Sequence, residues 1–149
     1  NRYMASKFFN ENFFTIDKKY LNLYKMINVD RGNWTSNKVT FNHVAAGLDS
    51  SKIYLNKLFN LLSDKNIDGH LIIYPWPRQI YIADKFHQTY WKKFSSNNNI
   101  KYLSLYNLFE GSNKIKIIFD NFIPGDVHWN KKGHNLIFNA IIKSNIIKN

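Results

Sequence analysis

The residues best suited to chemistry lie in the loop that precedes Asn130, near the carboxyl end of the chain. Asp126 and His128 stand two positions apart there. In an extended loop, residues i and i+2 point to the same side, so the carboxylate can accept a hydrogen bond from one imidazole nitrogen. That bond fixes the tautomer and leaves the other nitrogen free to take a proton from a nucleophile. The spacing predicts the acid–base half of a hydrolytic triad, with Asp126 and His128 as its catalytic residues.

Metal binding is the alternative chemistry for this loop. Asp126, His128 and His134 are candidate ligands, but the sequence holds no second cluster to complete a coordination shell. The chain has no cysteine, which excludes disulfides and cysteine-ligated zinc. We therefore expect neither a metal nor another cofactor.

The elements that must position this loop are predicted by hydrophobic periodicity and by capping residues. Residues 1–30 contain a weakly periodic helix, and residues 30–48 are the least readable region, interpreted as an insertion over the substrate side. The clearer signals are a helix capped at Asp49, Ser50 or Ser51 that ends near residue 64, a strand at 71–74 buried on both faces, a helix over 80–94, a strand at 102–106, a short strand or packed connection at 115–119, and a final helix capped by Asn130.

Helices and strands therefore alternate along one domain of residues 1–149, which predicts an α/β layer fold with a parallel sheet. In such folds the chemistry lies at the carboxyl edge of the strands. Both the stretch from Tyr74 to Pro77 and the loop before Asn130 fall at that edge.

Composition bounds the class of protein. The apolar fraction of 44% excludes a disordered chain, and no apolar run is long enough to cross a bilayer. The net charge is +11 and the pI is near 9.8. Because the lysines are scattered and form no basic cluster, we interpret the charge as background and expect no nucleic-acid partner.

The run from Gly125 to Asn130, followed by Gly133-His134, resembles the last conserved block of SGNH/GDSL hydrolases. The stretch Ile73-Tyr74-Pro75-Trp76-Pro77 resembles a strand end of envelope-associated bacterial members. The resemblance is specific near the carboxyl end and extends loosely back to about residue 50. It implies a three-layer α/β sandwich of the flavodoxin-like type, with Asp126 orienting the base and His128 acting as the base.

The family places its serine nucleophile on a Gly-Asp-Ser turn after the first strand, and helps to form its oxyanion hole with a glycine and an asparagine from two middle blocks. The nearest string here, Gly47-Leu48-Asp49-Ser50, opens a predicted helix and follows no buried strand. We therefore expect the nucleophile upstream of Asn1, so that this chain is the carboxyl-terminal portion of the domain. Such a chain is inactive alone and poorly stable, because the absent strands leave a sheet edge and an apolar face exposed.

The resemblance implies a serine-dependent ester hydrolase acting on a small-molecule or glycan ester, in the cell envelope or periplasm. Trp129, next to the base, and Trp76 are the candidate substrate-binding residues. Two alternatives stay open. One is an O-acyltransferase on a cell-envelope polysaccharide, and the other is a non-catalytic basic binding domain.

The remaining histidines and serines lack partners of the right type and spacing. His43, His70 and His87 are interpreted as structural or solvent-facing. Ser50, Ser51, Ser104 and Ser144 have no strained turn to activate their hydroxyls.

Overall fold

The computed structural model describes residues 17–28 and 42–146, with the side chains of residues 42–46 left out. Its elements follow the order α2 (Lys18–Ile27), α3 (Asn42–Asp64), β1 (His70–Ile73), α4 (Pro77–Ile82), α5 (Phe86–Asn97), β2 (Lys101–Ser104), the 3-10 helix η2 (Tyr106–Phe109), α6 (Lys114–Asn121) and α7 (Lys131–Lys143). The fold is therefore mixed α/β, as the alternation predicted.

The sheet of the described residues consists of β1 and β2, which run parallel with His70 opposite Lys101 and Ile73 opposite Ser104. Both strands lie close to their predicted positions. A parallel pair requires a crossover connection, and α4 and α5 provide it. Pro75 ends the first strand two residues after Ile73, since proline cannot donate to the ladder.

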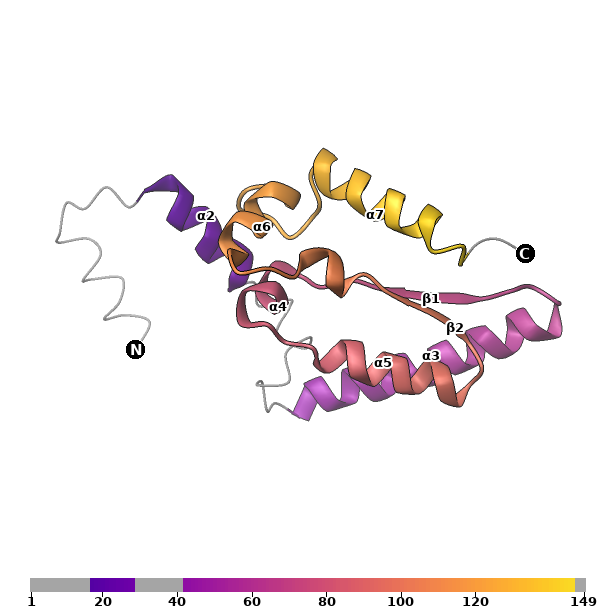
Figure 1. Ribbon diagram of the computed structural model, residues 1–149. Coiled ribbons are helices and arrows are strands. Elements are labelled where there is room, and N and C mark those ends of the chain that lie inside the picture. The colour runs from indigo at the N-terminus through magenta and orange to yellow at the C-terminus, as the bar shows by residue number, and fades with distance from the viewer. Residues whose placement is uncertain (1–16, 29–41, 147–149) are drawn as a thin grey trace.

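Two hydrophobic clusters cover the two faces of this sheet. Ile72 and Leu103 pack on one side against a cluster that includes Ile137 of α7. Leu71 and Ile73 pack on the other side, against Trp91 of α5 and partly buried side chains of α3. Figure 1 shows the same arrangement, with α7 over one face and α5 and α3 over the other. Alternate side chains of one strand therefore point into two different clusters.

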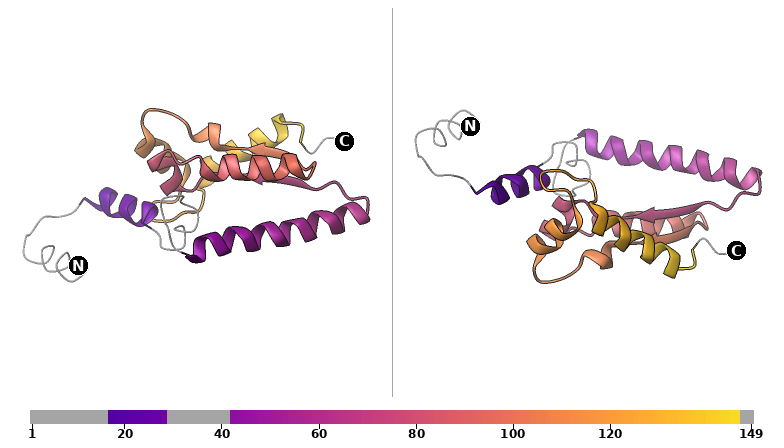
Figure 2. Two further views of the ribbon diagram at one scale, coloured as in Figure 1. Left: turned by 90° about the horizontal axis from the view of Figure 1, so that it is seen from below. Right: turned by 90° about the horizontal axis from the view of Figure 1, so that it is seen from above.

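The strand predicted to be buried on both faces does pack against a cluster on each face, but its burial is incomplete, because every residue of β1 is only half-buried. In both views of Figure 2, α3 stands to one side of α5 along its length. Tyr54, Leu58 and Leu61 of α3 follow each other at helical spacing and are all exposed. Among the described residues, β1 pairs only with β2. This two-stranded sheet is too narrow to cover the whole apolar face of α3.

Three predicted elements differ in extent or type. The first long helix begins at Asn42 instead of near residue 51. Ser51 lies inside it and does not cap it, since its hydroxyl donates to the Gly47 carbonyl one turn earlier, at 2.8 Å. Asp49 and Ser50 likewise lie inside α3. The predicted helix over 80–94 is two helices, separated where Ala83 takes a left-handed conformation with φ of 53°.

The segment predicted as a short strand or connection at 115–119 lies inside a helix, α6. Its start is capped by Asn113, whose side chain accepts a hydrogen bond from the Lys116 N–H at 2.9 Å. Ile118 is fully buried and belongs to the α7-side cluster. An apolar run of this length is compatible with a strand or with a helix, and the Asn113 cap favours the helix.

Helix α2 occupies part of the predicted amino-terminal helix, whereas residues 1–16 and most of the predicted insertion at 30–48 lie outside the described residues. Leu23 and Met26 of α2 are buried in the α7-side cluster. Arg78 of α4 donates to the Ile27 carbonyl at 3.2 Å, which ties the end of α2 to the start of α4. None of the helices in the described ranges combines the length and apolar composition of a membrane span.

Candidate functional site

The loop that carries Asp126 and His128 connects α6 to α7 and is closed by its own backbone. Phe122 and Trp129 form an antiparallel bridge, and the Ile123 N–H donates to the His128 carbonyl at 2.9 Å. The Asp126 N–H donates to the Ile123 carbonyl at 2.9 Å and closes a β-turn. Gly125, the third residue of that turn, has φ of 85°, the left-handed value that a type II turn requires there. The Pro124-Gly125 pair thus forms the turn that orients Asp126.

Asp126 and His128 form the hydrogen bond that their spacing predicts. His128 Nδ1 lies 2.9 Å from Asp126 Oδ1. The same oxygen accepts the Val127 N–H at 2.6 Å. The backbone N–H of Val127, and then the hydrogen bond to His128, hold the pKa of Asp126 below its ordinary value. An ionised carboxylate only accepts, so Nδ1 carries a proton, and in the neutral imidazole Nε2 then presents its lone pair.

The outer face of the pair is open to solvent. The His128 side chain is 77% exposed and the Asp126 side chain is 47% exposed. Nε2 makes no hydrogen bond within residues 17–28 and 42–146. The basic nitrogen is therefore accessible to a group brought in from another segment.

Asn130 holds the ends of this loop together as well as capping α7. Its Oδ1 accepts the Gly133 N–H at 3.0 Å, which confirms the predicted N-cap. Its Nδ2 donates to the carbonyls of Asp120, at 3.0 Å, and Phe122, at 3.2 Å. One amide thus fixes the start of α7 against the end of α6, on both sides of the loop.

Gly133 is required because the start of α7 lies very close to the end of α6. A Cβ at this position would lie 2.1 Å from the Asn121 carbonyl oxygen and 3.1 Å from Trp129 Cβ. No side chain fits there without moving the backbone of α6 or α7. Gly133 and Asn130 therefore position the loop, a role that the sequence analysis had not assigned to them.

Trp129 links the loop to the sheet. Its ring lies 4.3 Å from that of Tyr74, the residue that follows β1, and His134 meets it edge-on at 5.5 Å. The loop therefore lies at the carboxyl edge of β1, as predicted from the strand order. Trp129 is also partly buried against the α7-side cluster.

Trp76 is half-buried directly before α4, and its backbone N–H donates to Gln79 Oε1 at 2.8 Å. No hydrogen bond, ion pair or ring contact in the described part of the chain joins it to Asp126 or His128. Trp129 follows His128 in sequence, but its ring packs inward against Tyr74 and His134, whereas Trp76 lies directly before α4.

The serines that the sequence analysis set aside are bonded elsewhere or lie inside a helix. Ser104 Oγ accepts from Gln88 Nε2 at 3.0 Å, and Ser144 Oγ donates to the Ile141 carbonyl at 2.7 Å. Ser50 and Ser51 lie within α3. Among the residues that the structure describes, no hydroxyl is hydrogen-bonded to His128.

The other histidines are distributed over the fold. His87 is buried in α5 and His70 begins β1, at the opposite edge of the sheet from the dyad, while the side chain of His43 lies outside the described set. Across the described ranges, no three His, Cys, Asp or Glu residues converge closely enough to hold a metal ion. Asp126, His128 and His134 are thus not brought together as a ligand set.

In comparisons with protein-family models, curated protein sequences and solved structures, no match to this chain was found.

Proposed function

We propose that this chain contributes the acid–base part of a serine-dependent ester hydrolase of the SGNH/GDSL type. The observation that carries the proposal is the 2.9 Å hydrogen bond between Asp126 and His128 at the carboxyl edge of a parallel strand pair. In this assignment Asp126 is the orienting acid and His128 is the general base.

The complete fold in this proposal is a three-layer α/β sandwich, of which the described residues form a part. Two features support the assignment. Apolar clusters cover both faces of the strand pair, and the apolar face of α3 extends past the sheet. Further strands beside β1 would cover that face and leave the dyad at the edge where such folds carry their chemistry.

The chemistry follows from the state of the dyad. His128 Nε2 takes the proton of a serine hydroxyl as the serine oxygen attacks the ester carbonyl carbon. The protonated ring then gives that proton to the alcohol oxygen as the ester C–O bond breaks, which leaves an acyl-enzyme. Water repeats the sequence, with Nε2 as the base, and releases the carboxylic acid. Asp126, ionised throughout, stabilises the imidazolium that forms in each half.

The serine must come from a segment other than the described one, and the exposure of His128 leaves space for it. Trp129, which follows the base in sequence, is the proposed substrate contact, together with Trp76 directly before α4. An indole that contacts the substrate would offer an apolar surface to the acyl group or to the face of a sugar ring. The substrate class is therefore a small-molecule or glycan ester.

The test is labelling with a fluorophosphonate, which reacts with activated serines, in a chain extended at its amino end. Three forms are compared: the unchanged protein, His128→Ala, and His70→Ala as a control that removes an imidazole from the opposite edge of the sheet. We expect labelling of the unchanged protein and of His70→Ala, and its loss in His128→Ala. Circular dichroism establishes that all three are folded.

Absence of labelling in a folded, extended protein would refute the proposal, as would labelling that survives His128→Ala. A second measurement follows the fate of the acyl group from an aryl ester. Release as free acid supports the hydrolase, whereas transfer to an added sugar hydroxyl would assign the same dyad to an O-acyltransferase.

A further inference from the structure

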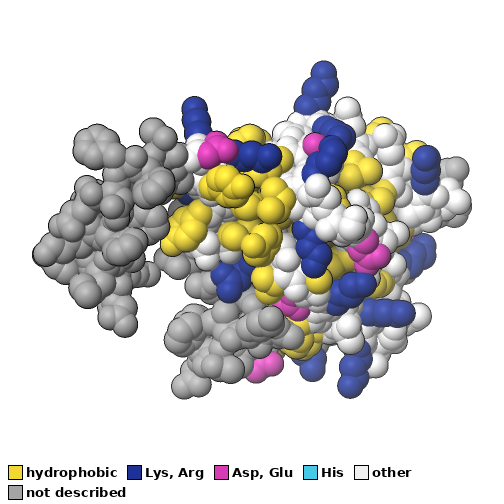
Figure 3. Space-filling model, turned by 60° about the vertical axis from the view of Figure 1, so that its left-hand side comes forward, with side chains coloured by type: hydrophobic (Ala, Val, Ile, Leu, Met, Phe, Trp, Pro, Cys, Tyr) yellow, Lys and Arg dark blue, Asp and Glu magenta, His cyan; other side chains and the backbone are white. Residues whose placement is uncertain are grey.

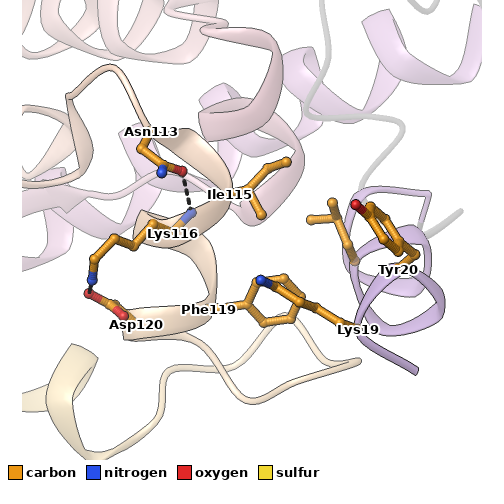
Figure 4. Close-up of a pocket in the computed structure, with 8 residues that line it drawn as sticks. Lys19, Tyr20, Asn113, Ile115, Lys116, Phe119 and Asp120 are labelled. Carbon is orange, nitrogen blue, oxygen red and sulfur yellow. Dashed lines mark hydrogen bonds and ion pairs between the residues drawn. The ribbon is translucent and has the colours of Figure 1, made fainter. Parts of the chain in front are cut away.

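A cavity of about 470 Å³ lies between α2 and α6. Figure 4 shows its lining, with Tyr20 and Lys19 from α2 facing Ile115 and Phe119 from α6. Leu23, which is buried, also lines it. Its volume is within the range of roughly 300–1,000 Å³ typical of small-molecule pockets.

The walls are mainly apolar and partly exposed, so the cavity opens on the surface. Tyr20 is 65% exposed and Ile115 is 36% exposed. Figure 3 brings the α2 and α6 side of the molecule forward and shows apolar side chains gathered there, with Lys and Arg side chains around them. Apolar surface left uncovered between two helices is a candidate binding surface.

The charges around the cavity favour an anion. Lys19 Nζ lies 5.7 Å from the centre of the Phe119 ring and makes no ion pair with a described residue. At the other end, Asp120 Oδ2 accepts from Lys116 Nζ at 2.7 Å and from Lys132 Nζ at 2.9 Å. Two lysines and one aspartate line the cavity, which gives its lining a net charge of +1.

We propose that the α2–α6 cavity binds a small anionic amphiphile, a carboxylate on an apolar body the size of a medium acyl chain. The apolar body lies against Leu23, Ile115 and Phe119, and the carboxylate pairs with Lys19. Lys19 is suited to this role because Asp120 already neutralises part of the Lys116 and Lys132 charge, which leaves Lys19 without a counterion in the described structure. The proposal is independent of the dyad, since neither Asp126 nor His128 lines this cavity.

The test uses the chain as it is, with octanoate and the uncharged, nearly isosteric octanamide as probes. Amide chemical shifts followed by NMR during titration report both affinity and place. We expect saturable octanoate shifts concentrated in α2 and α6, and weaker binding of octanamide.

Two neighbouring lysines provide the matched variants. Lys19→Gln removes the charge over the cavity, whereas Lys18→Gln removes an equal charge from the adjacent position, which does not line the cavity. Because an exposed ion pair contributes about 0.2–1 kcal/mol, Lys19→Gln should weaken octanoate binding by a factor of about 1.4–5 and leave octanamide binding unchanged. Lys18→Gln should change neither.

Three outcomes would overturn the proposal. They are octanoate shifts that do not saturate or lie outside α2 and α6, octanamide binding as tight as octanoate binding, and equal losses in Lys18→Gln and Lys19→Gln. The last outcome would assign the effect to the general positive charge of the chain.

Discussion

Replacing Gly133 by alanine probes the element that holds the candidate dyad in place. The added Cβ would lie 2.1 Å from the Asn121 carbonyl oxygen, a backbone atom at the end of α6 that no side-chain rotation can move. Either α7 or the end of α6 must therefore shift. The shift also lengthens the 3.0 Å bond from the Gly133 N–H to Asn130 Oδ1, which caps α7.

The expected cost combines two effects. Loss of a side-chain N-cap costs about 1 kcal/mol, and overpacking of a tight contact costs about 1–3 kcal/mol, so the free energy of unfolding should fall by about 2–4 kcal/mol. For a domain of this size, that change corresponds to a melting temperature lower by about 6–12 °C. Circular dichroism during urea denaturation and heating measures both quantities.

Gly47→Ala is the matched control. A Cβ at Gly47 meets no atom within 4 Å, and the residue lies inside α3. Because alanine is a better helix former than glycine by about 1 kcal/mol, Gly47→Ala should leave stability unchanged or raise it. A Gly133→Ala protein as stable as Gly47→Ala would refute the close packing of α7 on α6 that positions the loop.

Three further changes test the surroundings of the dyad. Asn130→Ala removes the cap of α7 and both bonds that join the loop ends, and should lower the free energy of unfolding in urea by about 1–3 kcal/mol. A smaller loss than at an ordinary exposed cap would contradict the role of Asn130 in joining the loop ends. Asp126 has a lowered pKa, so it stabilises the fold above the ordinary carboxyl range, and this contribution is lost as pH falls through the folded-state pKa. Asp126→Asn should therefore flatten the acid side of a stability–pH profile, and an unchanged slope would count against the lowered pKa. Asp120→Asn removes the negative charge that pairs with Lys116 and Lys132, and its small destabilisation should shrink at high ionic strength; an effect insensitive to salt would contradict an exposed ion-pair origin.

The sequence predicted the parts of the fold whose signals are local. The strand that becomes β1 is a short apolar run stopped by Pro75, and Asn130 is a good cap followed by helical periodicity. The bond between Asp126 and His128 was also predictable, because a turn residue and a two-residue spacing determine it.

Other features depend on tertiary contacts that no short window contains. The break between α4 and α5 falls at Ala83, in a left-handed conformation that sequence rules assign to glycine or asparagine. The crowding at Gly133 exists only because the end of α6 lies against the start of α7. The α6 helix was a different case, since its cap at Asn113 was present in the sequence and was not used.

The α2–α6 cavity had no sequence signal. Its walls come from helices separated by most of the chain, and Lys19 is one of many scattered lysines. Only the fold distinguishes Lys19, over the Phe119 ring, from its neighbour Lys18.

In the proposed function Asp126 orients His128 as a base, and the protonation of the two ring nitrogens of His128 is the direct test of that role. Long-range nitrogen–proton NMR of the neutral imidazole distinguishes the two tautomers. We predict that His128 carries its proton on Nδ1 and that Asp126→Ala abolishes this preference, while the spectrum of His70 stays unchanged. A proton on Nε2, or a tautomer mixture that Asp126→Ala does not alter, would refute this role of Asp126.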